Sequence, residues 1–173
     1  MNKKKITLYY VIALALAFIG GIYLANLLIA NKHNNSSLWH LTYDTNIVET
    51  QLGQINSDYL VLDFWSSWCK PCAKSLPYYL SLFDQYPKEK IRFITINLDI
   101  DNSQALKFLD DNNLNALPIF FDPNNKTNQF INISGLPMLI IYDQNRQVIH
   151  QKMGFKEASK HELKQRLDKL LKS

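Results

Sequence analysis

Residues 59–72 read Tyr59-Leu60-Val61-Leu62-Asp63-Phe64-Trp65-Ser66-Ser67-Trp68-Cys69-Lys70-Pro71-Cys72. This β-forming run ends at the only two cysteines of the chain, which are separated by two residues. Two thiols at this spacing can close a disulfide within one helical turn, and so small a ring removes little entropy from the unfolded chain. The pair therefore indicates redox chemistry rather than a structural cross-link.

The alternative for a Cys-x-x-Cys pair is half of a zinc site. Tetrahedral zinc needs four ligands, which usually come from a second such pair or from two closely spaced histidines. The histidines are His33, His40, His150 and His161, and no two of them are three to five residues apart. The second half of a zinc site is missing, so no metal site is predicted.

The N-terminus carries a second signal. Three lysines, Lys3 to Lys5, precede an uncharged run over residues 7–30, which as a helix would rise roughly 36 Å, enough to cross a bilayer. A cleaved secretory signal has a shorter apolar core and a small-x-small cleavage site, which residues 28–30 match poorly. An uncleaved anchor is expected, with the lysines in the cytoplasm and everything after Ala30 in an oxidising compartment.

Most of the net positive charge of the chain lies at this N-terminus. The expected organisation is a cytoplasmic N-terminus at 1–6, a transmembrane anchor at 7–30, a polar linker at 31–37 and a folded domain at 38–173. Of the formal net charge of +4, three charges are the membrane-flanking lysines, and from Asn31 onward 16 lysines and arginines face 15 acidic residues. The composition thus gives no support for a nucleic-acid partner.

Apolar residues after the cysteines predict alternating helices and strands. Leu76, Tyr79, Leu80 and Phe83 recur at helical spacing. Further expected elements are strands at 91–98 and 118–121, a helix at 103–112, a hairpin of strands at 137–142 and 147–153, and a last helix opened by a Ser159-x-x-Glu162 capping box. Residues 38–57 suit either a strand or a short helix. The expected fold class is α/β, with a mixed sheet flanked by helices.

From Tyr59 onward the chain resembles the thioredoxin superfamily. Residues 63–72 are similar to the active-site strand and turn of thioredoxins, and Pro77 stands where those proteins kink the following helix. Residues 103–130 resemble the insertion of membrane-anchored TlpA-like and ResA-like proteins. The resemblance implies a thioredoxin fold with a TlpA-like insertion, preceded by one N-terminal transmembrane helix.

A cis-proline loop that faces the cysteines is the second landmark of that superfamily. Two Leu-Pro pairs are candidates, and Leu136-Pro137 has the right surroundings, because an apolar strand, a polar turn, another strand and Gly154 follow it. Pro118 instead precedes a strand and an Asp-Pro turn. The resemblance therefore implies that Pro137 is the cis-proline.

Two departures concern the acid before the cysteines. TlpA-like proteins often lack an acid where Asp63 stands, so this position is more similar to thioredoxin itself. Thioredoxins commonly carry a lysine near that acid on the neighbouring strand, and Thr95 takes its place here. The usual ionic partner of the acid is therefore not expected.

The resemblance implies three catalytic roles. Cys69 is expected to attack a partner's disulfide, since free N–H groups at the start of a helix stabilise its thiolate. Cys72 is expected to resolve the mixed disulfide, and Asp63, buried on its strand, to accept the proton of Cys72. The Cys69–Cys72 disulfide is itself the redox-active group, so no bound cofactor is expected.

Four further residues are expected to bind substrate. Pro137 in cis would place the backbone of Leu136 opposite the cysteines, where it can pair with an extended substrate strand. Trp68 and Pro71, next to the cysteines in sequence, are expected to shape the same surface.

The sequence thus favours a membrane-anchored reductase of disulfides in exported proteins, with the folded domain in the bacterial periplasm and the anchor in the inner membrane. The expected partners are disulfide-containing exported proteins, with apocytochromes c as one candidate substrate, and a membrane thiol protein that donates electrons. A net disulfide oxidase or isomerase is an alternative, because direction depends on redox potential. A thioredoxin-fold copper metallochaperone is a weaker alternative. Such proteins resemble this chain in anchor and fold, but they use a Cys-x-x-x-Cys motif with a distant histidine.

Overall fold

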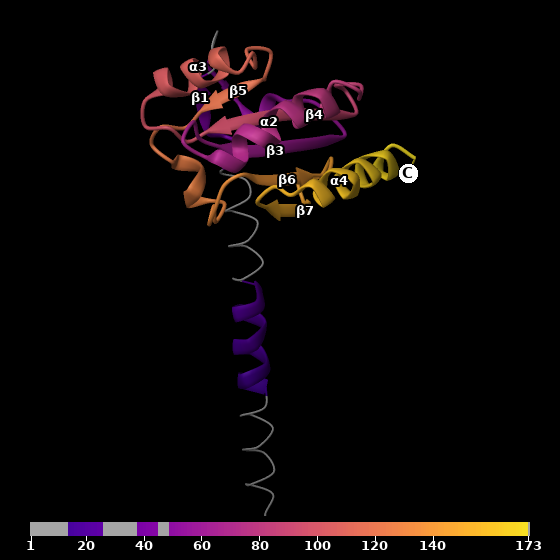
Figure 1. Ribbon diagram of the computed structural model, residues 1–173. Helices are drawn as coiled ribbons and strands as arrows, with labels where there is room; N and C mark the ends of the chain where they lie inside the picture. The colour runs from indigo at the N-terminus through magenta and orange to yellow at the C-terminus, as the bar shows by residue number, and fades with distance from the viewer. Residues whose placement is uncertain (1–13, 26–37, 45–48, 173) are drawn as a thin grey trace, which may run out of the picture. The chain divides into compact units, whose positions relative to one another are not determined.

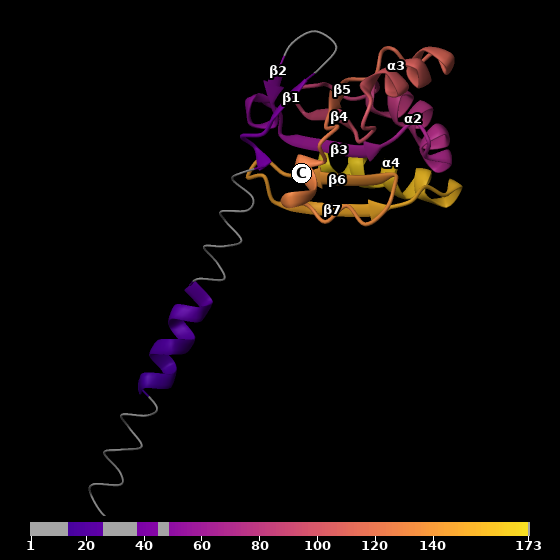
Figure 2. The ribbon, with the colours of Figure 1, turned by 90° about the vertical axis from the view of Figure 1, so that its left-hand side faces the viewer.

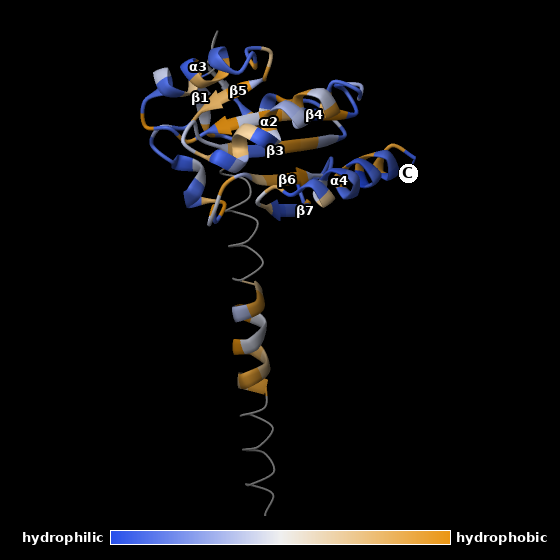
Figure 3. Ribbon diagram, in the orientation of Figure 1, coloured by the Kyte–Doolittle hydropathy of each residue, from blue (hydrophilic) through white to orange (hydrophobic). Residues whose placement is uncertain are grey.

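The computed structural model describes residues 14–25, 38–44 and 49–172. The chain divides into two compact units, Met1–Ser37 and Leu38–Ser173. The described part of the first unit is a helix at 14–25 that consists largely of hydrophobic residues (Figure 3). Its large apolar side chains are exposed. None of the described helices has both the length and the hydrophobicity that a membrane crossing requires. The ends of the expected anchor at 7–30 lie outside the described residues, and the anchor stays a prediction.

The described part of the second unit is built on a seven-stranded mixed sheet with the order β2-β1-β5-β4-β3-β6-β7 (Figures 1 and 2). The strands are β1 (Thr42–Asp44), β2 (Glu49–Gln51), β3 (Tyr59–Trp65), β4 (Ile91–Asn97), β5 (Ile119–Phe121), β6 (Met138–Tyr142) and β7 (Val148–Met153). The central strands β3, β4 and β5 are parallel, whereas β6 and β1 pair antiparallel with β3 and β5. The cysteines follow the carboxyl end of the central strand β3, where such sheets commonly place a site.

The two faces of the sheet are covered differently. The helices are α2 (Lys70–Phe83), α3 (Asn102–Asp111) and α4 (Glu157–Leu170), with short 3-10 helices η1 (Leu52–Gln54) and η2 (Lys126–Gln129). Val61 and Trp65 of β3 pack in one core cluster with residues of α2, α3 and α4. Leu62 and Phe64, which alternate with them, pack on the other face with Trp39 and the segment after η2. The segment at 38–57 forms β1, β2 and η1, so it provides both short strands and a cover for this face.

Most expected elements are confirmed within one to three residues of their predicted ends. The capping box at Ser159 is wrong, because α4 begins two residues earlier and its N-cap, Lys156, makes no side-chain cap. The side chain of Glu162 instead pairs with Lys152 on β7, with 2.5 Å between Oε2 and Nζ. The start of α4 is therefore not set by a side-chain cap. The helix begins three residues after Gly154, where the chain leaves β7.

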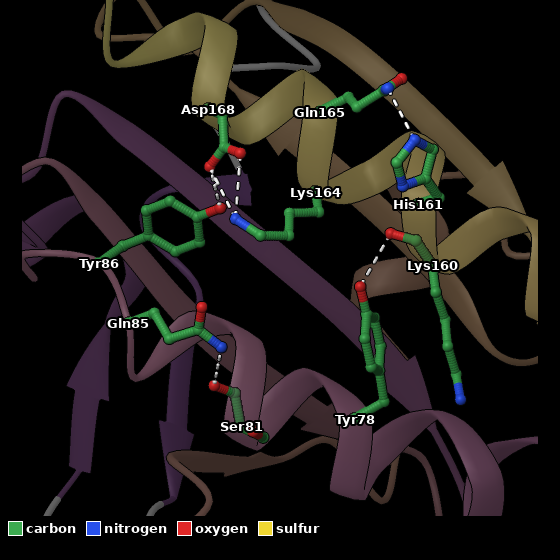
Figure 4. A network of polar contacts seen from close by, with 9 residues as sticks. All are labelled: Tyr78, Ser81, Gln85, Tyr86, Lys160, His161, Lys164, Gln165 and Asp168. Atoms are coloured by element: carbon green, nitrogen blue, oxygen red, sulfur yellow. Dashed lines mark hydrogen bonds and ion pairs between the residues drawn. The ribbon is translucent and has the colours of Figure 1, made fainter.

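Polar contacts join α2 and its C-terminal turn to α4 (Figure 4). The Tyr78 hydroxyl donates to the carbonyl of Lys160 at 2.8 Å, and the Tyr86 hydroxyl donates to Oδ1 of Asp168 at 2.7 Å. Lys164 also donates to Asp168. These bonds lie at the rim of the apolar contact made by Leu163 and Leu167, so α4 is held by a buried stripe and a paired polar border.

Candidate active site

The two cysteines lie at the start of α2. Cys69 is the N-cap, its N–H donates to the Ser66 carbonyl at 3.0 Å, and its Sγ accepts the N–H of Cys72 at 3.2 Å. The Sγ atoms of Cys69 and Cys72 form a disulfide with a Cα–Cα distance of 5.2 Å. A thiolate formed at Cys69 would keep this N–H donor and the positive end of the helix dipole, and both favour the charged form. Cys72 is fully buried one turn further on.

Asp63 is a buried carboxyl group without a described partner. It lies in the middle of β3, opposite Thr95 of β4 and Leu139 of β6, and neither of its oxygens has a hydrogen-bond partner among the described residues. The Thr95 hydroxyl donates to the carbonyl of Pro118 at 3.0 Å, so it does not serve Asp63. Burial raises the pKa of the Asp63 carboxyl well above its usual range.

This raised pKa bears on the role expected for Asp63. A carboxyl whose pKa approaches that of a thiol can exchange a proton with it at neutral pH. Asp63 also raises the pKa of the Tyr79 hydroxyl, although burial of Tyr79 is the larger cause. Val61 and Trp65 flank Asp63 on the strand face that packs against Cys72, which places the carboxyl on the same side of the sheet. Proton transfer from Cys72 to Asp63 stays a prediction.

The Leu136-Pro137 peptide bond is cis, and no other cis bond occurs in the described part of the chain. The choice of Pro137 over Pro118 is thus confirmed. Pro137 is buried, and its carbonyl accepts the N–H of Gly154 at 2.7 Å. Gly154, the residue after β7, has φ of 76°, a conformation that glycine adopts without strain, which explains why a glycine stands here.

An open groove of about 760 Å³ exposes the site. Four chain segments line it: the turn with Trp68, Cys69, Lys70 and Pro71; Leu98 and Ile100 after β4; Pro123, Asn124 and Asn125 after β5; and residues 133–136 before β6. Among the described residues that line the groove, Lys70 alone is charged. Cys69 and Leu136 share this groove and Cys72 does not line it, so the first cysteine is the one that a large partner can reach.

Trp68 and Ile100 form the most exposed apolar part of that lining. Their relative exposures are 69% and 89%, unlike that of Trp65, which is fully buried in the core. Exposed apolar side chains that are grouped on one surface, as in the lining of this groove, are typical of interaction sites. Trp68, Pro71 and Leu136 therefore lie together as expected, and their contact with substrate stays a prediction.

Sequence reasoning missed a buried polar group beside the groove. Asp99 is 2% exposed and accepts hydrogen bonds from the N–H of Ser67 at 2.9 Å and from the Ser67 hydroxyl at 3.1 Å. It also accepts a bond from Nδ2 of Asn97 at 2.8 Å. The signal in the sequence was an Asn-x-Asp at the end of a predicted strand. Nothing in that pattern named Ser67 as its partner.

A family comparison agrees with this geometry. The model of the thioredoxin-like family matches residues 56–148, more than half of the chain. The chain belongs to this family. The matched segment contains β3, both cysteines and the cis-proline, so the site and the family signal occupy the same part of the molecule.

Curated relatives of this thioredoxin-like chain are bacterial. Over 97 residues it is 30% identical to sporulation thiol-disulfide oxidoreductase A of Bacillus subtilis, covering 54% of this chain and 58% of that protein. Over 116 residues it is 27% identical to thiol-disulfide oxidoreductase ResA of Geobacillus kaustophilus, covering 65% and 66% of the two. The chain thus matches less than two thirds of the length of either relative.

Solved structures share the fold. A putative thiol:disulfide interchange protein DsbE from Chlorobium tepidum is similar with a TM-score of 0.70 and 28% identity, over 76% of this chain and 92% of that one. StoA from Bacillus subtilis has a TM-score of 0.61 at 23% identity, over 72% and 93%, and it supports the fold alone. The site has the groups that a protein-disulfide oxidoreductase needs: a largely buried disulfide, one sulfur of which lines a groove, and a buried carboxyl.

Proposed function

We propose that this protein is a membrane-anchored thiol:disulfide oxidoreductase that reduces disulfides of exported proteins. The observation that carries the proposal is the Cys69–Cys72 pair at the start of α2, with only Cys69 lining an open and nearly uncharged groove. The names of the curated relatives support the reaction class. The uncharged run at 7–30 supports an anchor in the bacterial inner membrane, with the thioredoxin-like unit in the periplasm.

The reaction begins with the reduced pair. The Cys69 thiolate attacks one sulfur of the partner's disulfide, forms a mixed disulfide and releases the other sulfur as a thiolate. Cys72 then loses its proton and attacks Cys69 Sγ, which re-forms the Cys69–Cys72 disulfide and releases the second sulfur of the partner. Two electrons pass to the partner, and a membrane thiol protein returns them. Asp63 takes the proton of Cys72, because its raised pKa suits that exchange.

The groove favours an extended partner segment. Its lining is largely apolar or carries amide groups, so it would bury apolar residues beside the partner's cysteine. Leu136 lines the groove, and an extended strand of the partner would pair with its backbone. A segment of this kind is exposed in proteins that are not yet folded, which suits a reductase that acts on newly exported chains.

A trapping experiment tests the proposal. In full-length Cys72→Ser the mixed disulfide on Cys69 cannot be resolved, so partners should accumulate as covalent adducts in cells. Cys69→Ser, which lacks the attacking sulfur, is the matched control and should trap none. Adducts with apocytochromes c would assign cytochrome c maturation, and adducts with many secreted proteins would assign general disulfide reduction.

The direction of electron flow needs its own measurement. A redox potential near that of thioredoxin, about −270 mV, supports reduction, and one near that of DsbA, about −120 mV, would make the protein an oxidase. Protease accessibility of the folded unit in spheroplasts tests the topology. Digestion from outside supports the periplasmic placement, and protection until the membrane is broken would overturn it.

A further inference from the structure

Two chain segments that line the groove are joined by one buried carboxylate. The first is the turn between β3 and α2, which carries Trp68, and the second is the loop between β4 and α3, which carries Ile100. Backbone pairing between these segments continues as far as the bond from Leu98 N–H to the Trp65 carbonyl, at 2.9 Å. Beyond it, the hydrogen bonds described between the two segments are donated by Ser67 and accepted by the Asp99 carboxylate.

The geometry of Asp99 favours a fixed position. One carboxylate oxygen, Oδ2, accepts the Ser67 N–H at 2.9 Å and Asn97 Nδ2 at 2.8 Å, and the other, Oδ1, accepts the Ser67 hydroxyl at 3.1 Å. The Asp99 N–H returns a bond to Asn97 Oδ1 at 3.0 Å. Charge-assisted bonds of this kind are short and directional, so both loops are held through a single side chain.

The residues next to Ser67 and Asp99 in sequence line the groove, which links the Ser67–Asp99 contact to substrate binding. Trp68 follows Ser67 directly, and Leu98 and Ile100 flank Asp99, and all three line the groove beside Cys69. We propose that Asp99 is a positioning residue that sets the spacing between Trp68 and Ile100 for a protein substrate. The inference rests on the proposed function, because only a partner that fills the groove would sense that spacing.

The contact should matter for large partners and not for small ones. A small disulfide needs only the Cys69 thiolate, which the N–H of Cys72 and the helix start stabilise independently of Asp99. A protein disulfide also needs the apolar surfaces at the correct separation, and a misplacement of about 1 Å can lower a rate by roughly a hundredfold. A merely structural role would lower both rates together through loss of folded protein.

The test compares two substrates with the full chain in detergent, using insulin as the protein disulfide and dithionitrobenzoate as the small one. Asp99→Ala should lower the rate constant for insulin roughly ten- to a hundredfold and leave that for dithionitrobenzoate within about twofold of wild type. Ser67→Ala, which keeps the N–H contact, should give a smaller decrease, and Ser67→Thr, which keeps the hydroxyl, should resemble wild type. Asp84→Ala at the end of α2 is the control for loss of an exposed acid.

Equal decreases for both substrates, or no decrease for either in Asp99→Ala and Ser67→Ala, would overturn the positioning role. A wild-type chain that reduces neither disulfide would contradict the proposed reductase. In that case hydrogen exchange at the Ser67 amide still decides the positioning contact: protection lost in Asp99→Ala and kept in Asp84→Ala supports it, and protection kept in both overturns it.

Discussion

Polar groups are hydrogen-bonded at the α2–α4 interface, here called the paired region, and buried without a described partner in residues 63–66, here called the unpaired region. At the interface the hydroxyls of Tyr78 and Tyr86 each donate to a partner (Figure 4). In residues 63–66, which run from the middle of β3 to the residue after it, both oxygens of Asp63, the indole nitrogen of Trp65 and the hydroxyl of Ser66 are buried without a described protein partner. The two regions belong to the same folded unit, so the difference is local.

This difference separates groups that hold the fold from groups that react. An unpaired buried polar group costs about 1–3 kcal/mol, and the interface avoids that cost by pairing its hydroxyls at the solvent rim. Asp63 carries this cost, because its carboxyl is buried and unpaired three residues before the turn with the cysteines. Local rules of pairing are commonly broken at functional sites, which is why the comparison points to Asp63.

The largest expected effect comes from removing the acid of the unpaired region. Asp63→Asn keeps the shape of the side chain and cannot accept the proton of Cys72, so resolution of the mixed disulfide should slow by about 10²- to 10⁴-fold. Stopped-flow kinetics of resolution measures this step, and the preceding attack by Cys69 should be unchanged. Asp168→Asn at the paired interface is the control, and equal resolution rates in all three proteins would remove the role of Asp63.

A second prediction concerns the pH dependence of stability. Burial raises the pKa of Asp63 well above its unfolded value of 3.8, so above that pH the folded chain holds a proton that the unfolded chain has lost. The contribution of the protonated carboxyl to the free energy of unfolding is fully present below the unfolded pKa. It decreases by about 1.4 kcal/mol per pH unit as pH rises toward the folded pKa. The oxidised Asp63→Asn variant should therefore gain stability relative to wild type from pH 4 toward neutrality.

Denaturant unfolding of the two proteins across that pH range measures the difference in the free energy of unfolding. A difference that stays constant with pH would mean that the Asp63 carboxyl is already ionised in the folded state. That result would contradict the raised pKa of Asp63.

A third and smaller effect belongs to the paired region. Tyr78→Phe removes a neutral hydrogen bond to the Lys160 carbonyl and leaves the ring in place, so the free energy of unfolding should fall by about 1 kcal/mol and Tm by about 2–4 °C. The resolution rate should be that of wild type. A slower rate in Tyr78→Phe would show that the two regions are coupled and that the separation drawn between them is wrong.

The sequence predicted the local features of this molecule better than the long-range ones. Helical and strand periodicity located β3, α2 and the β6–β7 hairpin, because each is set by apolar spacing within one segment. The cysteine pair and the cis-proline came from local motifs and a family resemblance. Asp99 was missed because its partner, Ser67, lies in another loop, and only the pairing of β3 with β4 brings the two together.

The failure at α4 has the same cause. Ser159 and Glu162 have the spacing of a capping box, yet Glu162 pairs with Lys152 of the neighbouring strand. A tertiary contact thus replaced a local one of comparable strength. The segment at 38–57 was ambiguous for a similar reason. Strands β1 and β2 are three residues each, too short to show a period, and their conformation is decided by the pairing of β1 with β5 and of β2 with β1.

The smallest effect is expected at the exposed edge of the α2–α4 interface. Lys164 bonds to Asp168 at 3.0 Å, but both side chains are nearly half exposed, so water and salt compete with the ion pair. Lys164→Met should leave Tm within experimental error of wild type, and the result should not change between low and high salt. A clear loss of stability, greater at low salt, would show that charge pairing holds α4 as well as the Leu163 and Leu167 stripe and the Tyr78 hydroxyl do.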